Sequence, residues 1–258
     1  MTAAPAAHLP LTFSGGDAVV TGGASGIGAA VAATLMAAGV RTIAIDLRTP
    51  APHPDLPADL HVAVAVDIRD PDLAHRITAA GAPLESVAYL VNCAGILDNT
   101  GFSGVDHQAW LRCLEVNLVG AYHLIDILTP ALRRAPAAAV VNITSIEAER
   151  VIALSDPDPT PHYAASKAGL RMLTQSAARA LAAHGVRVNS VSPGFVATPM
   201  AAAHGDTTIL PPALAARVPV GRFATTTEIA HAVAFLLSDQ AAYITGTDLR
   251  VDGGFHLT

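Results

Sequence analysis

Short apolar runs alternate along the chain with longer stretches in which apolar residues recur at helical spacing. Runs bounded by glycine, proline or acidic residues are typical of strands that are buried on both faces of a parallel sheet. Such runs predict strands at residues 17–21, 41–46, 61–66, 87–91, 139–143, 186–191 and 248–251. The stretches between them predict helices at residues 29–39, 71–80, 106–134, 163–183 and 227–237.

Strands that alternate with helices in this way predict an α/β fold, a doubly wound parallel sheet of the Rossmann type with right-handed crossovers. No linker rich in Pro, Gly or Ser is long enough to separate two domains, so residues 14–258 are expected to form a single domain. Residues 1–13 are rich in Ala and Pro and are expected to be a loose arm. Residues 199–218 are expected to be irregular or a short helix, where a substrate lid would lie.

Composition narrows the classes of protein to which this chain belongs. Its 258 residues carry a formal net charge of −6, and it has no run of basic residues. That balance argues against nucleic acid or an anionic membrane surface as the main partner. The first charged residue is Asp17, so no basic signal-peptide region precedes it, and a cytoplasmic location is expected. Residues 18–40 are uncharged, but the glycines and hydroxyl residues among them argue against a membrane span.

The residue types that bind metals are present without a metal-binding pattern. Cys93 and Cys113 match no metal or disulfide spacing, and the eleven histidines form no pair with a third ligand. In the cytoplasm both cysteines would be reduced. No metal is therefore expected.

A glycine-rich turn lies between the first predicted strand and the first predicted helix. Gly22, Gly26 and Gly28 let the backbone turn tightly and approach a pyrophosphate, although their spacing differs from the common G-x-G-x-x-G pattern. The free N–H groups at the start of the following helix would then face the phosphates. Asp46 ends the second predicted strand, 18 residues after Gly28, where an acid accepts the hydroxyls of an adenosine ribose. These features predict a dinucleotide site.

The same acid bears on which dinucleotide binds. The carboxylate of Asp46 would repel the 2′-phosphate of NADP, and Ser25 in the turn offers that phosphate no positive charge. Arg48 is close in sequence and would favour the phosphate, yet the balance predicts NAD as the cofactor. Asp67 follows the third predicted strand and is either a cap for the adenine ring or an ordinary acidic turn residue.

The chain has a single lysine, Lys167, and it follows Tyr163 by four residues. With four tyrosines among 258 residues, a lysine placed at random would do so at about 4 of 258 positions. Residues four apart lie on one face of a helix, so the phenol and the ammonium can share a site. A nearby cation favours the phenolate and lowers the pKa of a tyrosine, which can then exchange a proton with an alcohol or ketone near neutral pH.

Polar and glycine residues follow several predicted strands at their carboxyl ends, where ligands bind in a sheet of this kind. Those residues are Gly22, Asp46, Asp67, residues 92–95, Ser145, Pro193 and Gly194. Ser145 closes its strand with a hydroxyl that can hydrogen-bond a substrate oxygen. The helix that carries Tyr163 begins beside this rim, so the sequence predicts an active site there.

With these motifs in place, the chain resembles the single-domain short-chain dehydrogenase/reductase family over nearly all of residues 14–254. The motifs that carry the resemblance are Thr21-Gly-Gly-Ala-Ser-Gly-Ile-Gly28, Asp67-Ile68, Asn92-Cys-Ala-Gly95, Asn117-Leu-Val-Gly120, Ile143-Thr-Ser145, Tyr163-x-x-Ser-Lys167, Pro193-Gly194 through Thr198, and Val251-Asp-Gly-Gly254. Their number and order make the resemblance specific.

The resemblance implies a role for each matched residue. Tyr163 would be the general acid/base, Ser145 would hold the substrate oxygen, and Lys167 would lower the tyrosine pKa and bind the nicotinamide ribose. Asn117 would position a water that relays protons to Lys167. The residues that would bind the cofactor are Gly22, Ser25, Gly26, Ile27, Gly28, Asp46, Asp67, Ile68, Asn92, Ala94, Gly95, Tyr163, Lys167, Pro193, Gly194, Val196 and Thr198.

Three features depart from the family's pattern. Cys93 replaces the second asparagine of the usual Asn-Asn pair, and Thr144 stands where a serine is common. The interval between Ser145 and Tyr163 is longer than usual, and the additional residues lie in 155–161, which contain three prolines. That segment is expected to be stiff, non-helical and placed over the substrate mouth.

These observations predict an NAD-dependent oxidoreductase that interconverts a small-molecule secondary alcohol and a ketone by hydride transfer. The alternatives among enzymes are an NADP-dependent, carrier-bound 3-oxoacyl reductase and a dihydrodiol dehydrogenase, and the alternative outside enzymes is a regulatory protein that senses dinucleotides. The residues expected to line the substrate site are Ile96, Leu97, Ile146, Glu147, Phe195 and Met200, which favour a largely apolar molecule. The resemblance and the small residues of the predicted helix 163–183 favour a homotetramer.

Overall fold

The computed structural model describes residues 10–98, 100–152, 160–203 and 205–258. Most of the predicted arm, residues 1–9, and most of the proline-rich segment, residues 155–159, lie outside the described residues. The chain is held to the domain from Pro10 onward, whose carbonyl oxygen accepts from the Gln240 side chain at 3.3 Å. The Thr12 N–H donates to the side chain of Gln240 at 3.0 Å, and the Ser14 hydroxyl donates to Asp239 at 2.9 Å.

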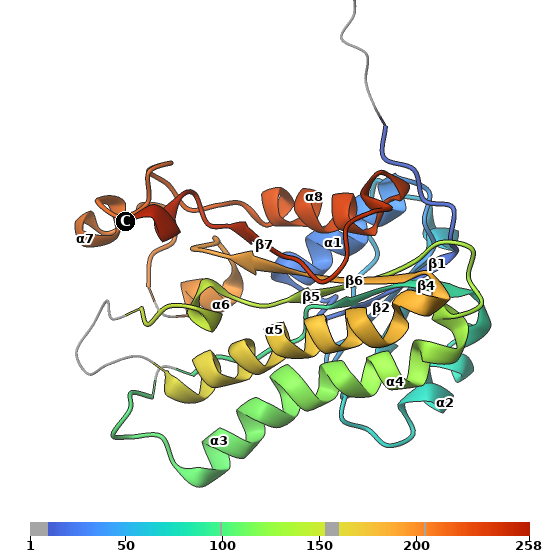
Figure 1. Ribbon diagram of the computed structural model, residues 1–258, viewed down its shortest axis with the longest axis horizontal. Helices are drawn as coiled ribbons and strands as arrows, with labels where there is room; N and C mark the ends of the chain where they lie inside the picture. Colours follow the sequence, from blue (N-terminus) through green and yellow to red (C-terminus); the bar gives the residue numbers. More distant parts are fainter. Residues whose placement is uncertain (1–9, 99, 153–159, 204) are drawn as a thin grey trace, which may run out of the picture.

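One sheet of parallel strands organises the described residues (Figure 1). Its strand order is β3-β2-β1-β4-β5-β6-β7, so the order reverses between β1 and β4, which is where a doubly wound sheet binds its ligand. The strands are β1 Asp17–Thr21, β2 Thr42–Asp46, β3 His61–Ala65, β4 Val87–Asn92, β5 Ala138–Ile143, β6 Val186–Pro193 and β7 Asp248–Val251. The predicted fold class is confirmed.

Helices cover both faces of the sheet (Figure 1). One face carries α1 Gly26–Ala37 and α8 Thr226–Leu237, which pack against each other. The other face carries α2 Leu73–Ala79, α3 His107–Leu114, α4 Gly120–Leu132 and α5 Pro161–Leu181. Two short helices, α6 Pro199–Ala202 and α7 Pro212–Ala215, lie in the segment predicted to be irregular or a short helix. None of the described helices is both long and apolar enough to cross a membrane.

The strands are apolar throughout because helices bury them from both sides. Every residue of β4 and of β5 is buried. Side chains of a strand point alternately to its two faces. Accordingly Leu90 belongs to the core under α4 and α5, whereas Tyr89 and Val91 belong to the core under α1 and α8.

Two predicted helices differ from those in the structure. The first begins at Gly26 rather than at residue 29, because Gly26 and Gly28 form the first helical turn instead of a preceding loop. The predicted helix 106–134 is not one continuous α-helix. A π-helical turn, Glu115–Val119, separates α3 from α4. Such a turn shifts the apolar pattern by a single residue, which is too small a change to recognise in one short stretch of sequence.

Candidate active site

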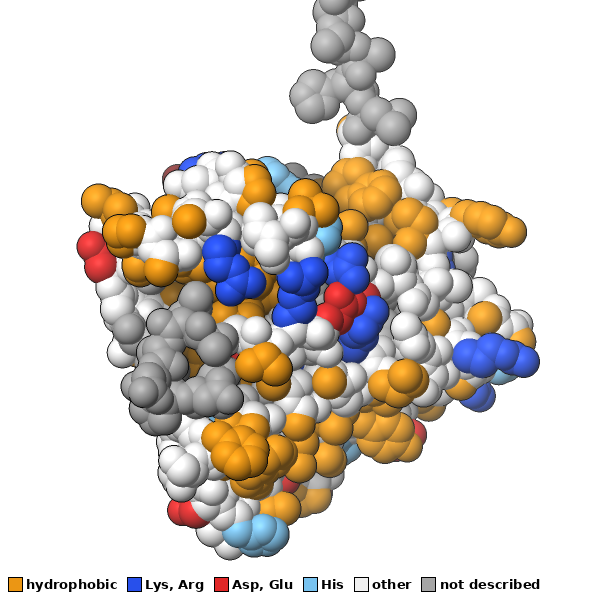
Figure 2. All heavy atoms as spheres, turned by 60° about the vertical axis from the view of Figure 1, so that its left-hand side comes forward, with side chains coloured by type: hydrophobic (Ala, Val, Ile, Leu, Met, Phe, Trp, Pro, Cys, Tyr) orange, Lys and Arg blue, Asp and Glu red, His pale blue; other side chains and the backbone are white. Residues whose placement is uncertain are grey.

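A cavity of about 1020 Å³ opens at the carboxyl ends of the strands. This edge of the sheet faces forward in Figure 2, where basic side chains gather around acidic ones beside apolar patches. Every residue predicted to bind the cofactor lines the cavity except Asn92. The predicted catalytic residues also line it, except Asn117, and so do all six predicted substrate residues. The rim inferred from strand ends is therefore one continuous site.

Three glycines of the segment between β1 and α1 take backbone conformations or close contacts that other residues would strain. Gly22 and Gly26 have φ values of +70° and +56°, in the left-handed region that favours glycine. A β-carbon on Gly28 would lie 2.2 Å from the carbonyl oxygen of Gly22. Ser25 precedes α1 without a capping hydrogen bond from its side chain, and the first turn holds no acidic residue. The N–H groups of that turn therefore fit a diphosphate.

Thr21 fixes this turn against the segment that follows β4. Its hydroxyl oxygen accepts hydrogen bonds from the backbone N–H groups of Cys93 and Ala94, both at 3.0 Å. Burial raises the pKa of the Cys93 thiol to about 12, so the thiol stays protonated. The link between the two loops is made by the backbone of Cys93. The cysteine that departs from the family's pattern leaves this link intact.

The two acidic residues at the far end of the cavity are held differently. Asp46 accepts the N–H groups of Ala24 at 3.1 Å and of Arg48 at 3.2 Å, which places its carboxylate beside the glycine-rich turn. Asp67 forms an ion pair with Arg69 at 2.7 Å, and the hydrogen bond from Arg69 holds the pKa of Asp67 below its usual value. The carboxylate of Asp67 is thus engaged by an arginine, whereas Asp46 forms no ion pair with any described residue.

Ser145, Tyr163 and Lys167 converge at the near end of the cavity. Ser145 follows β5, and its side chain lies near enough to the phenol of Tyr163 on α5 to lower the phenol's pKa. Lys167 lies one turn further along α5, with its ammonium nitrogen 5.6 Å from the centre of the Tyr163 ring. That ammonium donates to the carbonyl oxygen of Ile143 at 2.8 Å. The spacing in the sequence thus translates into a shared site, as expected for residues four apart on a helix.

Burial and nearby side chains shift the pKa of Tyr163. Burial raises it above its ordinary value, the charge of Glu147 raises it further, and the hydrogen bond with Ser145 lowers it. Burial also lowers the pKa of Lys167 to about 8. Desolvation dominates the pKa of Tyr163 in this structure, where the Lys167 ammonium donates to a backbone carbonyl, and the expected lowering of the tyrosine pKa by Lys167 stays a prediction.

Asn117 lies in the π-helical turn behind the cavity wall. Its side-chain oxygen accepts the N–H of Ile96 at 2.8 Å, and its amide group donates to the Ile96 carbonyl and to the Ser166 hydroxyl, both at 3.0 Å. A β-carbon on Gly95 would lie 3.3 Å from Asn117 and 3.4 Å from the Lys167 ammonium nitrogen. Asn117 therefore holds the loop after β4 against Lys167. Its predicted role in positioning a relay water stays a prediction.

The side chain of Asn92 does not face the cavity, contrary to its predicted place among the cofactor residues. Its amide donates to the side chain of Asn142 at 2.8 Å and lies beside the carbonyl of Ala121 on α4. The predicted strand ends at Val91, but β4 continues through Asn92. One further strand residue turns this side chain toward the opposite face of the sheet.

Comparison with known proteins decides the family. Residues 22–256 match the family model described as enoyl-(acyl carrier protein) reductase. The structure is also similar to that of an oxidoreductase of the short-chain dehydrogenase/reductase family from Burkholderia thailandensis. The TM-score is 0.83 and the identity 30%, with 95% of this chain and 94% of that chain covered. The chain belongs to the short-chain dehydrogenase/reductase family. It is therefore an oxidoreductase.

Two other members of the short-chain dehydrogenase/reductase family show how varied its substrates are. The chain is 37% identical over 246 residues to a cis-4-hydroxycyclohexanecarboxylate dehydrogenase of Sinomonas cyclohexanicum, covering 92% of this chain and 95% of that protein. It is 34% identical over 249 residues to a 3-oxoacyl-[acyl-carrier-protein] reductase of Staphylococcus aureus strain Mu50, covering 93% and 98%. Similarity at this level leaves the substrate to be argued from the site.

Several lining residues of this short-chain dehydrogenase/reductase were not predicted from the sequence. Arg69 and Arg112 reach the cavity from the loop after β3 and from α3. An apolar wall is added by Ile152, Ile209, Leu210, Leu214 and Phe223. Most of this wall comes from the segment after β6, where apolar residues occur without helical or strand periodicity. Among the residues that the structure describes, no cluster of His, Cys, Asp or Glu is arranged to hold a metal ion.

Proposed function

We propose that the chain is an NAD-dependent dehydrogenase that interconverts a secondary alcohol and a ketone. One observation carries the proposal. A hydroxyl, a phenol and an ammonium, from Ser145, Tyr163 and Lys167, meet in the same cavity as a glycine-rich turn and the acid Asp46. Ser145, Tyr163 and Lys167 can handle the proton of a carbinol group. The glycine-rich turn and Asp46 can hold a dinucleotide.

Each part of the cofactor has a matching part of the cavity. The N–H groups of the first turn of α1 would hold the diphosphate. The carboxylate of Asp46 would accept the hydroxyls of the adenosine ribose, and Lys167 would donate to the nicotinamide ribose. When bound, the nicotinamide would accept a hydride from the carbinol carbon, which leaves a ketone.

The chain's own residues would handle the proton. Ser145 would donate a hydrogen bond to the substrate oxygen, and Tyr163 would take the hydroxyl proton during oxidation or return it during reduction. Because burial raises the pKa of Tyr163, the phenol is the major form at neutral pH and is ready to donate a proton to a ketone. Oxidation needs the phenolate, so its rate should rise with pH above neutrality.

Asp46 supports NAD over NADP. Two backbone N–H groups orient its carboxylate, and it is not neutralised by an ion pair with any described residue. A ribose 2′-phosphate would face that negative charge in a partly buried site. The nearby Arg48 also lines the cavity and reduces the expected preference without reversing it.

The test is direct. Purified protein is incubated with NAD⁺ and a panel of secondary alcohols, and with NADH and the matching ketones, while the absorbance of NADH is followed. Turnover of at least one pair, faster with NAD than with NADP at equal concentrations, is the expected result. Faster turnover with NADP refutes the cofactor assignment, and no turnover across a broad panel refutes the alcohol–ketone assignment.

A second candidate is reduction of a carrier-bound 3-oxoacyl group with NADP. The observation that favours it is the similarity to a 3-oxoacyl-[acyl-carrier-protein] reductase over 93% of the chain. The carboxylate of Asp46 argues against it. Incubation with NADPH and a 3-oxoacyl thioester tests this candidate in the same assay, and rapid oxidation of NADPH would favour it over the first. A purely dinucleotide-sensing role does not require the convergence of Ser145, Tyr163 and Lys167.

A further inference from the structure

Glu147 lies next to the residue proposed to hold the substrate oxygen. After β5 the chain makes a short 3-10 turn, Ile146–Ala148, and the Ser145 hydroxyl oxygen accepts the N–H of Glu147 at 3.1 Å. That bond fixes the backbone of Glu147 relative to Ser145. The side chain of Glu147 lines the cavity together with Tyr163. A carboxyl group thus lines the same cavity as the proposed reaction centre, close enough for its charge to raise the pKa of Tyr163.

The structure gives this carboxyl group little to neutralise it. Its one hydrogen bond from a described side chain comes from the Thr160 hydroxyl at 3.3 Å. None of the described basic side chains forms an ion pair with it, and residues 153–159 contain no Lys, Arg or His. Glu149, two residues away and outside the cavity, forms ion pairs with both Arg171 and Arg250 at 2.6 Å.

The wall around Glu147 is apolar. Ile146, Ile152, Leu214 and Phe195 pack in one apolar cluster that lines the same cavity, and burial raises the pKa of Glu147 to about 7. Glu147 is partly buried, and neither of its carboxylate oxygens is both buried and without a partner, so water can reach the carboxyl group from the cavity. A ligand that displaces this water must supply a donor in its place, or the hydrogen bond is lost. A purely apolar substrate, as expected from the other lining residues, would leave the carboxyl group unsatisfied.

We propose that Glu147 recognises a hydrogen-bond donor, a hydroxyl or an ammonium group, that the substrate carries a few bonds from the reacting carbinol. The inference rests on the proposed alcohol–ketone chemistry and names its substrate class. The substrates are diols, polyols or amino alcohols rather than simple alcohols. A carboxylate at the same place on the substrate is repelled by Glu147 and disfavoured.

The experiment compares matched ring alcohols. Oxidation by wild-type protein with saturating NAD⁺ is measured above the pKa of Glu147, where its carboxyl group is ionised, for cyclohexanol, the cyclohexanediols, 2-aminocyclohexanol and cis-4-hydroxycyclohexanecarboxylate. The best diol or amino alcohol should exceed cyclohexanol in kcat/KM by about tenfold or more, as expected for a hydrogen bond to a charged group. A larger gain for the amino alcohol than for any diol identifies an ammonium as the preferred donor, and the reverse identifies a hydroxyl.

Two variants test whether Glu147 is responsible. Glu147→Gln should reduce the preference to below about threefold and should improve the relative rate with the carboxylate. Glu149→Gln removes a carboxylate of the same charge outside the cavity and should keep the wild-type preference. If Glu147→Gln does not fold, as judged by circular dichroism, Glu147→Leu replaces it, because leucine matches the surrounding wall. Wild-type preference retained by either folded Glu147 variant overturns the inference, as does a wild-type protein that shows no preference.

A binding measurement separates this inference from the proposed reaction. The same compounds are titrated into the protein–NADH complex and into the protein alone, with NADH fluorescence and thermal stability as the signals. If no alcohol is oxidised, the proposed reaction fails, yet tighter binding of the diol or amino alcohol by wild type than by Glu147→Gln still supports the recognition role. Equal binding of cyclohexanol and of every compound that carries a donor overturns it.

Discussion

Lys167 lies where a lysine is poorly stabilised. It is 4% exposed, its one hydrogen bond within the described chain is to the Ile143 carbonyl, and burial lowers its pKa to about 8 from 10.5. A charged group that costs stability in the interior points to a role in function. We therefore expect Lys167, the single lysine of the chain, to lower the stability of the fold while it is required for activity.

We predict that Lys167→Met abolishes turnover and raises the free energy of unfolding at pH 7 by about 1–3 kcal/mol. Between pH 8 and 10.5 the unfolded lysine is protonated and the folded one is not, so wild-type stability rises with pH across this window. The difference in the free energy of unfolding between Lys167→Met and wild type should therefore become smaller as the pH rises from 8 to 10.5. Urea denaturation at pH 7 and pH 10 measures both effects. A variant less stable than wild type at pH 7 would contradict this account.

Asp46 is the residue on which cofactor choice depends. Asp46→Ser removes the charge that faces a 2′-phosphate while keeping a hydrogen-bonding group at the end of β2. The ratio of kcat/KM for NAD to that for NADP should fall by about tenfold, which corresponds to ~1.4 kcal/mol. Asp59→Ser, which removes the same charge at an exposed position outside the cavity, serves as the control. An unchanged ratio in Asp46→Ser would remove Asp46 from the selectivity argument.

For single residues, the site was easiest to predict from the sequence where a rare residue stands at a spacing that has one structural meaning. Tyr163 and Lys167 were found because the spacing of a single lysine from a tyrosine maps directly onto one helix face. The orientation of Asn92 was not found, because it depends on whether a strand runs one residue further. Arg69 was missed because its approach to Asp67 is set by the loop after β3.

At the scale of elements, the start of α1 is shaped by a backbone contact that tolerates no side chain. Gly28→Ala would place a β-carbon 2.2 Å from the Gly22 carbonyl oxygen, so the turn must open. We predict at least a tenfold loss of NAD affinity, measured by quenching of protein fluorescence or by calorimetry. Ala37→Ser, at the exposed end of the same helix, should bind as wild type does. Wild-type affinity in Gly28→Ala would show that this turn does not contact the cofactor.

Element boundaries were predictable where apolar runs are short and bounded, as for β1 and β7, whose ends match the prediction. The helix predicted at 106–134 shows the limit. Its apolar positions continue smoothly through Glu115–Val119, yet the backbone there is π-helical. The wider turn carries Asn117, whose side chain bonds the loop after β4. The π-helical backbone thus goes with a contact between segments that are distant in sequence, and such a contact cannot be predicted from local hydrophobic periodicity.

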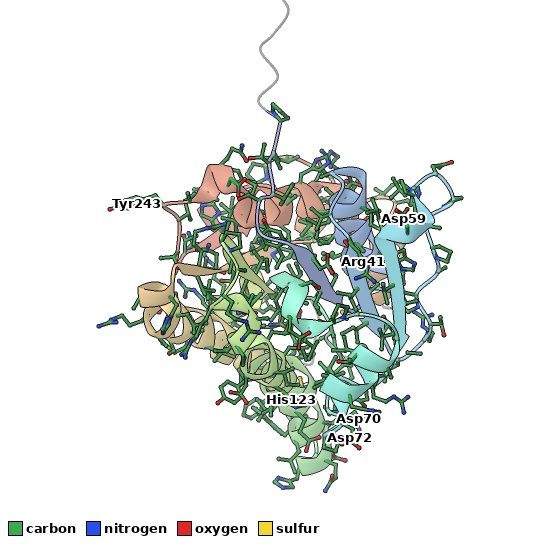
Figure 3. The ribbon with its side chains drawn as sticks, turned by 90° about the vertical axis from the view of Figure 1, so that its right-hand side faces the viewer. Arg41, Asp59, Asp70, Asp72, His123 and Tyr243 are labelled. Carbon is green, nitrogen blue, oxygen red and sulfur yellow. The ribbon has the colours of Figure 1, made fainter. Side chains whose placement is uncertain are left out.

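At the scale of the whole molecule, several large apolar side chains are exposed on the surface and indicate where subunits could associate. Val119 and Tyr122 are 54% exposed, and Met172 on the neighbouring α5 is 61% exposed. Tyr243 projects from the body of the molecule, away from the sheet (Figure 3). Large apolar side chains in adjacent exposed positions are typical of subunit interfaces. They favour a subunit interface on this surface, and the homotetramer expected from the family resemblance stays a prediction.

We predict a mass near four times the 26.3 kDa of one chain by light scattering at micromolar concentration. The double variant Tyr122→Asp, Met172→Asp should dissociate into smaller species, because buried carboxylates would face each other across the interface. Phe102→Asp, at an exposed position in the loop before α3, is the control and should keep the wild-type mass. A monomer mass for wild type would contradict the prediction.

The central claim is that the phenol of Tyr163 moves the proton in a nicotinamide-dependent alcohol–ketone reaction. The most direct test compares NADH formation by wild type and by Tyr163→Phe on the best alcohol, with NADH binding and circular dichroism confirming an intact site. We predict that kcat falls by about 100-fold or more while NADH binding stays within a few-fold, since general acid/base groups contribute about 10²–10⁴ in rate. A Tyr163→Phe protein that retains more than about a tenth of wild-type kcat, a loss of under ~1.4 kcal/mol, would contradict it.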